Sequence, residues 1–456
     1  MTHVAVIDIG KTNAKLALVD LETLKELAVV KRPNKVFPGP PWPHFDVDGI
    51  WDFLLNAMAD FHQSHGINAV SVTTHGACAA LIGPDGDLAA PILDYEHDGP
   101  DATAADYDAI RPPFDETGAP RLPMGLNLSA QLYWQFAEEP ELRKKTVAIV
   151  TYPQYWGYRL TGAYACDVSS LGCHTDLWNP QAGAFSTLTE RLGISDLLGE
   201  PRKCSDVLGT ILPDIAAKTG LDPATPVYCG IHDSNASLLP HVLRQTEPFS
   251  VVSTGTWVIA MTISGHAVQL NPTRDTLINV NALGDPVPSA RFMGGREYDT
   301  ILRGDAADYT QDDITHVAQN GPMLLPSIIP ESGPFQNRFA EWIGAEPPRG
   351  STERTVATGF YLALMTAECL ALTGHNGTII IEGPFAGNPS YCSMLATATN
   401  CAVEASGGTT GTSEGAALLA MPAGLQPQSE DQRRSYLPNK DPLLRYAKAW
   451  MSKVNG

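Results

Sequence analysis

The sequence lacks closely spaced cysteine pairs and long apolar runs. Its eight cysteines are scattered over 456 residues, and none belongs to a C-x-x-C motif. This usage indicates reduced thiols rather than a disulfide framework or a zinc site. No uninterrupted apolar stretch reaches the ~20 residues of a membrane span, and the N-terminus has no cationic segment followed by a signal-type apolar run. We therefore expect a cytoplasmic protein without a membrane partner.

Positive charge is also scarce. Lys and Arg number 30 against 50 Asp and Glu, which gives a formal net charge of -20 at pH 7. Nucleic acids and anionic membranes favour clustered Lys and Arg, so we expect neither as a partner. An anionic cofactor is not excluded, because it needs only a few local backbone N–H groups and cations. The length, with 43% apolar and 18% charged residues, predicts a globular chain of two domains or more.

The stretch 227–237 stands near the middle of the chain. A short apolar run ends at Gly230, His232 and Asp233 follow, and a helix-like segment covers 235–243. A carboxylate at the end of a strand, beside a glycine corner and a helix start, lies where open α/β sheets bind their ligands. The alternative is that Asp233 only caps the helix.

Residues 4–19 read as a strand, a tight glycine turn and a second strand. Such turns point several backbone N–H groups one way and form an anion nest. Asp8 ends the first arm and could hold Mg²⁺ through water. Lys11 and Lys15 could then meet phosphate oxygens. An ordinary β-hairpin with solvated lysines is the competing interpretation.

A second hairpin of the same kind spans 249–261, about half a chain later. That separation is typical of duplicated domains. Two facing Gly/Thr hairpins could grip one polyphosphate from both sides. Two unrelated hairpins are the alternative.

Two other strands are predicted to end in polar groups. The strand at 69–76 ends in His75 and Gly76, and the stretch 91–98 passes from apolar residues to Tyr95, Glu96, His97 and Asp98. Carboxylates and imidazoles pair with hydroxyl groups, and an aromatic ring covers an apolar sugar face. A buried structural histidine and a solvated loop are the respective alternatives.

A buried strand at 378–382 breaks into a glycine/proline turn, and this turn, free of large polar side chains at 383–386, could cover an adenine ring. A tight strand-to-helix connection would look the same.

Together these stretches resemble the FGGY carbohydrate kinases of the actin/hexokinase/Hsp70-like ATPase superfamily, in the family's order from about residue 4 to 420. The opening DIGKTNAK is similar to the family's D-x-G-T-x-S-x-R phosphate motif, with Lys11 in place of Thr and Lys15 in place of Arg. His75-Gly76 resembles the sugar-contacting pair. The His-Asp at 232–233 and the Gly-Thr-Trp at 255–257 resemble the motif forms of rhamnulokinases and fuculokinases. The family's Arg after Asp98 is missing.

The resemblance implies an α/β fold of two ribonuclease-H-like domains around an interdomain cleft, here 1–236 and 237–456. It implies ATP and Mg²⁺ as cofactors and a small sugar as the substrate. The site residues that follow are Asp233 as the catalytic base; Gly10, Lys11, Thr12, Asn13, Lys15, Thr254, Gly255, Thr256, Gly383, Pro384, Phe385 and Asn388 for ATP and its phosphates; His75, Gly76, Tyr95, His97, Asp98, His232 and Asp233 for the sugar; and Asp8 for the metal.

The expected reaction is ATP-dependent phosphorylation of a ketose. A 6-deoxyketose such as L-fuculose or L-rhamnulose is favoured, with a xylulose-like sugar next, and a homodimer is a reasonable default. Three other classes stay open. They are a metal-dependent isomerase or aldolase with His75, His97, His232 and Asp233 as ligands, a nucleotide-binding regulatory protein, and an iron–sulfur activator ATPase.

Overall fold

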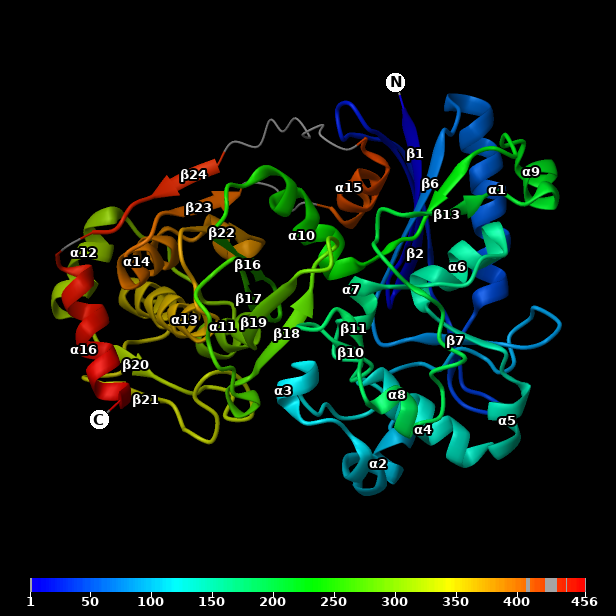
Figure 1. Cartoon of the computed structure of the whole chain (residues 1–456). Helices are drawn as coiled ribbons and strands as arrows, with labels where there is room; N and C mark the ends of the chain where they lie inside the picture. The colour runs from blue at the N-terminus through cyan, green and yellow to red at the C-terminus, as the bar shows by residue number, and fades with distance from the viewer. Residues whose placement is uncertain (1, 407–410, 423–432, 440, 456) are drawn as a thin grey trace. The chain divides into compact units, whose positions relative to one another are not determined.

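The computed structural model describes residues 2–406, 411–422, 433–439 and 441–455, and the chain forms two compact units (Figure 1). Unit 1 comprises Met1–Arg244, Ile278–Pro286 and Thr410–Ser429, and unit 2 comprises Gln245–Leu277, Val287–Thr409 and Glu430–Gly456.

The division of the chain differs from a single cut after residue 236. Helix α10 (Asp233–Arg244) runs through that position, and its consecutive turns form one hydrogen-bonded element, so the break follows Arg244. Helix α15 (Thr412–Ala417) also returns to unit 1, where the Ser71 hydroxyl donates to the carbonyl oxygen of Ala416 at 2.7 Å. Each unit is therefore assembled from separate stretches of the chain.

Unit 1 is built on a sheet in the order β13-β14-β6-β1-β2-β3, with β15 also paired to β6. Its strands are β1 (His3–Ile9), β2 (Asn13–Asp20), β3 (Glu26–Pro33), β6 (Ala69–Thr74), β13 (Val207–Thr210), β14 (Pro226–Tyr228) and β15 (Ile231–His232). β1 is antiparallel to β2 and parallel to β6. All six residues of β6 are buried, as expected for a strand covered on both faces.

A glycine interrupts the pairing of the strand that leads to Asp233. Val227 pairs with Val70 and Ile231 pairs with Thr73, so the incoming chain holds one residue more than β6 does. Gly230 takes up this extra residue at φ 100°, a conformation that side chains rarely adopt, and a Cβ atom there would lie 2.9 Å from the carbonyl oxygen of Val72. The bulge sets which way His232 and Asp233 point.

Helices cover both faces of the unit 1 sheet. Helix α1 (Val47–His65) begins at Asp46, whose carboxylate accepts the Gly49 N–H at 3.0 Å, and buries one apolar face. In Figure 1, α1 and α15 lie on opposite sides of β1 and β6. The side chains of α1 belong to one apolar cluster of the unit and those of α15 to another.

Unit 2 repeats the strand arrangement of unit 1. Its sheet has the order β18-β19-β17-β16-β22-β23-β24, with β18 (Thr276–Val280), β19 (Pro286–Phe292), β17 (Val258–Ile263), β16 (Phe249–Thr254), β22 (Thr378–Glu382), β23 (Val403–Ser406) and β24 (Arg433–Tyr436). β16 is antiparallel to β17 and parallel to β22, as β1 is to β2 and β6. The two hairpins predicted from the sequence occupy equivalent places in two similar sheets.

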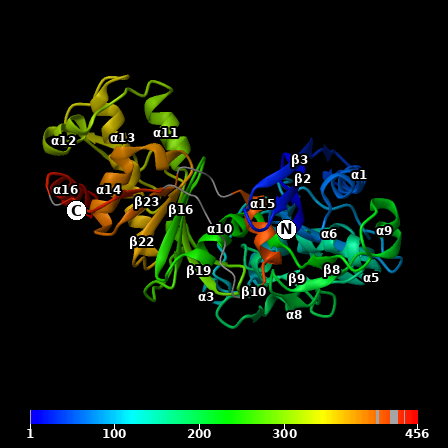
Figure 2. The same cartoon turned by 90° about the horizontal axis from the view of Figure 1, so that it is seen from above.

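The core of unit 2 packs around helix α13 (Thr352–Leu372). This is the one helix in the described ranges that is long and apolar enough to cross a membrane, and 83% of its most apolar window is buried inside the protein. Figure 2 shows α13 with α14 (Pro389–Thr399) and α16 (Leu443–Asn455) on one side of β16, β22 and β23. The apolar run of α13 thus serves as the centre of a domain core.

The remaining elements of unit 1 are β4 (Val36–Phe37), β5 (His44–Phe45), β7 (Ala79–Ile82), η1 (Gly99–Thr103), α2 (Ala104–Ile110), α3 (Phe114–Thr117), α4 (Leu128–Glu138), α5 (Pro140–Lys145), β8 (Ala148–Thr151), α6 (Tyr152–Thr161), β9 (Cys166–Asp167), α7 (Val168–Leu171), β10 (Trp178–Asn179), β11 (Ala184–Phe185), α8 (Leu188–Arg191), β12 (Pro201–Arg202), α9 (Pro213–Thr219) and η4 (Leu418–Ala420). Those of unit 2 are η2 (Pro272–Arg274), α11 (Gly294–Leu302), α12 (Gln311–Asn320), β20 (Met323–Leu325), β21 (Glu341–Ile343) and η3 (Pro384–Gly387).

The carboxyl group of Glu297 is fully buried in unit 2. Glu297 on α11 accepts a hydrogen bond from the Tyr361 hydroxyl at 2.9 Å and one from the Ile329 N–H at 3.2 Å. Burial raises the pKa of Glu297 from 4.5 to about 7, and these hydrogen bonds offset only part of that rise. The folded chain therefore binds this proton more tightly than the unfolded chain does.

The stabilisation linked to this proton is complete below the unfolded pKa and is lost as the pH rises through the folded pKa. Between pH 4.5 and pH 7, the free energy of unfolding of unit 2 should fall by about 3 kcal/mol more in the wild type than in Glu297→Gln, at about 1.4 kcal/mol per pKa unit. Denaturant titrations at a series of pH values measure the difference. Glu331→Gln, at an exposed carboxylate of unit 2, should follow the wild type. Parallel curves for the wild type and Glu297→Gln would contradict this account.

Candidate active site

The first glycine turn is held by its carbonyl groups. The Gly10 N–H donates to the Asn13 carbonyl at 2.9 Å and closes the turn between β1 and β2. Asn34 supports the turn from one side, because its backbone N–H donates to the Thr12 carbonyl and its side-chain amide to the Gly10 carbonyl, both at 2.9 Å. With these carbonyl oxygens and the Gly10 N–H engaged, the remaining amides are the groups that the turn can offer to an anion.

The two oxygens of the Asp8 carboxylate have different surroundings. Lys15 Nζ lies 3.0 Å from Oδ2, and the Thr412 hydroxyl donates to the same oxygen. Within the described part of the chain, Oδ1 receives no hydrogen bond or ion pair. A carboxylate with one oxygen fixed and the other open suits a hydrated Mg²⁺ ion, which commonly uses one or two protein carboxylates and keeps several waters.

Lys11 contacts a different set of residues from Lys15, which lies beside Asp8. Its ammonium group pairs with the Asp94 carboxylate and lies 3.1 Å from Glu96 Oε2. The same nitrogen is 4.8 Å from the centre of the Tyr95 ring and 5.4 Å from that of Phe45. The structure thus brings Lys11 to the predicted sugar-binding stretch, where two carboxylates and two aromatic rings surround it.

His75 belongs to the same cluster. Its ring centre lies 5.2 Å from those of Phe45 and Tyr95 and 5.1 Å from that of Tyr152. Nδ1 lies 2.9 Å from the Gly76 carbonyl oxygen, and Nε2 is buried without a partner among the described residues. Burial lowers the pKa of His75, so the ring is neutral near pH 7. A neutral imidazole with one unpaired nitrogen is suited to a hydroxyl group.

The side chains of His97 and Asp98 make other contacts than this cluster. The His97 ring packs on Trp134 at 5.1 Å, and its Nδ1 lies 3.6 Å from the carboxylate of Asp98, which is 88% exposed. No group of three or more His, Cys, Asp or Glu side chains that could hold a metal ion occurs in the ranges that the structure describes. The ligand set of a metal-dependent isomerase or aldolase is therefore not assembled there.

Asp233 is the first residue of helix α10. Its Oδ1 accepts from the Ser234 N–H at 2.6 Å and from the Ser234 hydroxyl at 3.4 Å, and lies 3.2 Å from His232 Nε2. A helix N-cap instead accepts an amide two or three residues further on. All the contacts that described residues make with this carboxylate end on Oδ1, so Oδ2 is the open oxygen, on a side chain that is 32% exposed.

Gly76 lies directly against the His232 ring. A Cβ atom at this position would be 2.9 Å from His232 Nε2 and 3.4 Å from Cys173 Sγ, so a larger residue would displace the ring. The sequence predicted a sugar contact for Gly76, and the structure gives a packing reason for glycine at this position. Cys173 was not predicted as a site residue, because only the fold places it beside His232.

In unit 2 the second glycine turn and the 383–388 turn are packed together. The Gly255 N–H closes its turn on the Trp257 carbonyl at 2.9 Å. The Thr254 hydroxyl donates to the Glu382 carbonyl and accepts the Phe385 N–H at 3.1 Å. Gly383 has φ 83°, and a Cβ atom there would lie 2.0 Å from the Thr254 carbonyl oxygen. The approach of the two turns depends on that missing side chain.

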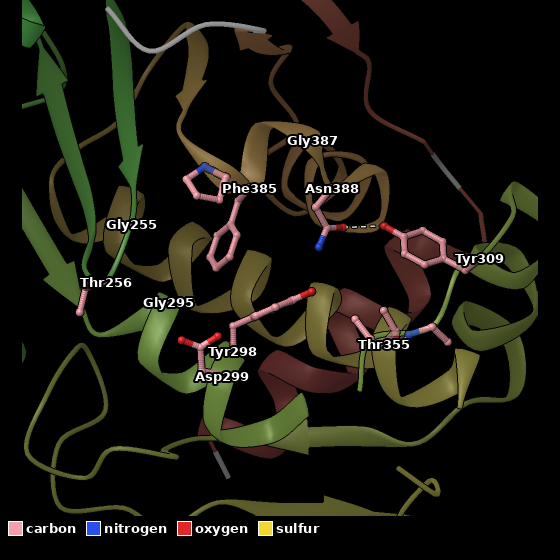
Figure 3. Close-up of a pocket in the computed structure, with 13 residues that line it drawn as sticks. Gly255, Thr256, Gly295, Tyr298, Asp299, Tyr309, Thr355, Phe385, Gly387 and Asn388 are labelled. Carbon is pink, nitrogen blue, oxygen red and sulfur yellow. Dashed lines mark hydrogen bonds between the residues drawn. The ribbon is translucent and has the colours of Figure 1, made fainter. Parts of the chain in front are cut away.

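These two turns form one wall of a pocket of about 490 Å³ (Figure 3). It is lined by Gly255, Thr256, Gly295, Tyr298, Asp299, Ala306, Ala307, Tyr309, Thr355, Pro384, Phe385, Gly387 and Asn388. The predicted residues Gly255, Thr256, Pro384, Phe385 and Asn388 therefore meet in one cavity. The helix α11 residues and Tyr309 were not predicted, although the Gly294–Gly295 pair at the start of α11 is a signal of close packing in the sequence.

Asn388 is oriented by its neighbours. Its Oδ1 accepts from the Tyr309 hydroxyl at 2.7 Å, from the Ser390 hydroxyl at 2.8 Å and from the Tyr391 N–H at 3.0 Å. With the oxygen engaged, the amide nitrogen points into the pocket, as Figure 3 shows. The pocket thus combines one fixed donor with the faces of Phe385 and Tyr298, whose ring centres are 5.7 Å apart.

Two sequence profiles cover most of the chain. Residues 3–240 match the FGGY family of carbohydrate kinases, N-terminal domain, and residues 246–429 match carbohydrate kinase FGGY, C-terminal domain. L-fuculokinase of Escherichia coli (strain K12) is 27% identical over 279 residues, 58% of this chain and 57% of the relative. Xylulose kinase of Bacillus subtilis (strain 168) is 31% identical over 105 residues, 23% of this chain and 21% of the relative. The match with L-fuculokinase spans little more than half of that relative's length.

Solved structures match over the full length. A carbohydrate kinase from Novosphingobium aromaticivorans is 36% identical with a TM-score of 0.91, covering 99% of this chain and 100% of that one. The xylulose kinase from Lactobacillus acidophilus, at 18% identity and a TM-score of 0.78, covers 100% and 98% and shows the fold alone. The predicted α/β fold with two actin/hexokinase-type domains is confirmed.

Gly76→Ala should destabilise unit 1 by about 1–3 kcal/mol, the usual cost of extra atoms in a packed site, because the new methyl group meets the buried His232 ring. Thermal or denaturant unfolding measures the loss. Gly411→Ala serves as the control, since a Cβ atom there meets no other atom within 4 Å. Equal stability of the two variants would show that the His232 ring is free to move.

Proposed function

The chain belongs to the FGGY family of carbohydrate kinases, and on that premise we propose that it transfers the γ-phosphoryl group of ATP to a hydroxyl of a small sugar. The observation that carries the proposal is the pair of glycine turns at equivalent places in two sheets of the same order. One turn is accompanied by carboxylates and lysines, and the other forms a wall of a pocket of suitable size for a nucleoside. The reaction requires the two sets of residues to act on the same substrates.

Asp233 is the proposed base. Its Oδ1 is occupied by Ser234 and His232, which fix the carboxylate, and Oδ2 is the atom that accepts the proton of the attacking hydroxyl. The sugar hydroxyl gives its proton to Oδ2 while the sugar oxygen forms a bond to the γ-phosphorus. The bond between that phosphorus and the leaving ADP oxygen breaks at the same time. Positioning and charge stabilisation supply most of the catalysis in phosphoryl transfer, so a fixed carboxylate is sufficient.

The turn amides and Lys15 are the proposed phosphate ligands. Backbone N–H groups of the two glycine turns bind phosphate oxygens, and the ammonium group of Lys15 offsets charge that develops on them. Mg²⁺, when bound beside Asp8, would neutralise phosphate charge. The motif position of Lys11 implies a phosphate contact, but its ammonium group pairs with Asp94 and Glu96. We assign it to the sugar side, where it orders the loop that carries Tyr95.

The proposed acceptor is a ketose, with 6-deoxyketoses such as L-fuculose or L-rhamnulose ahead of xylulose. The His-Asp and Gly-Thr-Trp motif forms support this ranking, as do relatives described as L-fuculokinase and rhamnulokinase. Tyr95 and the neutral His75 offer an aromatic face and a hydroxyl partner to such a sugar. A cytoplasmic location and a homodimer remain predictions.

A coupled assay of ADP release tests the proposal. Purified protein with Mg·ATP is given free ketoses, aldoses and polyols in turn, including L-fuculose, L-rhamnulose and xylulose. We expect one sugar to raise ADP release far above the rate without sugar. A flat response with intact ATP binding would favour a nucleotide-binding regulatory protein, and absence of ATP binding would exclude the kinase.

Asp233→Asn should lower kcat by at least about 100-fold, since the amide cannot serve as the base, and should leave ATP binding unchanged. Steady-state kinetics with the sugar found above and a direct nucleotide-binding measurement check the two parts. Asp85→Asn, at an exposed carboxylate of unit 1, is the matched control. Near-normal turnover in Asp233→Asn would assign the base elsewhere.

Tyr309→Phe should raise the KM for ATP by about 2- to 10-fold and leave the KM for the sugar unchanged. The variant loses one hydrogen bond to Asn388, worth about 0.5–1.5 kcal/mol, and with it the orientation of the amide in the pocket. Tyr446→Phe also loses one hydroxyl hydrogen bond, to the Pro322 carbonyl, but outside the pocket. A change in the sugar KM alone would place the nucleotide elsewhere.

A further inference from the structure

Cys173 lies next to the proposed base, in the turn that follows helix α7. Its Sγ is 3.5 Å from His232 Nε2, and the same nitrogen is 3.2 Å from Asp233 Oδ1. The sulfur, the imidazole and the carboxylate therefore form a continuous row. Gly76 packs against the first two members of the row and has no side chain to push them apart.

The backbone around this row is fixed from the side of α7. The His232 N–H donates to the Ser169 hydroxyl oxygen at 3.0 Å, and Ser169 in turn donates to the Asp167 carboxylate. Asp167 also caps α7 by accepting the Ser170 N–H at 2.8 Å. Helix α7, which leads into the turn of Cys173, is thus tied directly to the strand that carries His232, and this holds the sulfur at a set distance from the ring.

The electrostatic setting of Cys173 differs from that of the other cysteines. Burial would raise the pKa of its thiol, but the adjacent His174 and His232 lower it to about 5. The seven other cysteines have a pKa raised by burial, namely Cys78, Cys166, Cys204, Cys229, Cys369, Cys392 and Cys401. Cys173 therefore differs from an ordinary apolar core cysteine.

His232 shows the complementary effect. Burial would lower its pKa, but the Cys173 thiolate, Asp233 and Asp167 raise it to about 10. The amide nitrogen of Asn235 lies 3.4 Å from Nδ1. The two shifts have the same cause, since each charged group favours the other, and both favour an imidazolium beside a thiolate.

We propose that Cys173 is a positioning residue, whose sulfur holds the His232 ring in place and thereby keeps the Asp233 carboxylate oriented with Oδ2 open. This inference rests on the role proposed for Asp233. The Nε2–H group of His232 is shared between the sulfur and Oδ1, and it donates more strongly from an imidazolium than from a neutral ring. The sulfur thus acts on the carboxylate without touching the substrate.

The test compares the wild type with Cys173→Ser, which keeps a hydroxyl near the ring but removes the thiolate. The first readout is the pH titration of the His232 ring by NMR, with the resonance assigned from its loss in His232→Gln. We expect the ring to titrate near pH 10 in the wild type and at least about one pH unit lower in Cys173→Ser. Cys166→Ser, at a buried thiol of the same unit, should leave the His232 titration unchanged.

The second readout is the pH profile of kcat/KM with the sugar identified above. If activity needs a protonated His232, the alkaline limb of the profile moves to lower pH in Cys173→Ser, whereas a loss of packing alone would lower the profile without moving it. At neutral pH, we expect kcat of Cys173→Ser to be about tenfold lower than that of the wild type, with the KM for ATP unchanged. A loss of this size is comparable to that of one charge-assisted hydrogen bond.

Several outcomes would overturn the proposal. One is a wild-type His232 that titrates near an ordinary histidine pKa, which is informative even if Cys173→Ser fails to fold. Another is a titration or an alkaline limb that Cys173→Ser leaves in place. The NMR result does not depend on turnover, so it separates this inference from the proposed function. If Asp233→Asn keeps its activity while Cys173→Ser shifts the His232 titration, the base is wrong and the thiolate–imidazolium pair stands.

Discussion

The register of three parallel strands determines where the polar groups of unit 1 meet. Strand β6 pairs with β1 on one side and with β15 on the other, so that Ile9 and His232 are both level with Thr74. The residues that follow these strand ends are Gly10 after β1, His75 after β6 and Asp233 after β15. Because the carboxyl ends of parallel strands lie at one edge of a sheet, a glycine turn, a neutral histidine and a carboxylate come together there. The bulge at Gly230 is part of this constraint, since one residue fewer would turn the side chains of β15 to the opposite face.

Unit 2 uses the same strand order for a different kind of site. Its glycine turn has Thr256 where the first turn has Lys11, and its neighbours are the 383–388 turn and the start of α11 instead of a charged loop. Close backbone contacts replace ion pairs there. A Cβ atom at Gly295 would lie 2.1 Å from the Gly255 carbonyl oxygen, and Gly383 meets Thr254 in the same way. The repeated framework thus carries carboxylates and lysines in one unit, and aromatic faces with close backbone contacts in the other.

Much of this arrangement could be predicted from the sequence, because its signals are local. The glycine turns and the buried strands beside them depend on residues close together in the chain. The family and the fold class followed from the order of those signals and are confirmed. The domain boundary was less accessible, since the return of α15 to unit 1 depends on contacts between residues as far apart as Ser71 and Ala416.

The site residues that escaped prediction share the same cause. Asp94, Cys173 and Tyr309 each gain their place from a partner far along the chain, namely Lys11, His232 and Asn388. His97 and Asp98 show the reverse case, because they stand in a stretch of suitable composition but pack against Trp134 and toward solvent. Composition indicates which chemical groups are available in a stretch, whereas long-range pairing decides which of them converge.

At the sheet edge of unit 1, the carboxylates of Asp8 and Asp233 are each held through one of their two oxygens. Lys15 and Thr412 engage Oδ2 of Asp8, and Ser234 and His232 engage Oδ1 of Asp233. Holding one oxygen removes the rotational freedom of the group, so that the second oxygen faces a defined direction at little further entropic cost when a ligand binds. For Asp233 the direction is set by the His232 ring, and the ring is set in turn by Cys173, Gly76 and the α7 backbone. The orientation of the Asp233 carboxylate therefore depends on residues that do not touch it and act through the His232 ring.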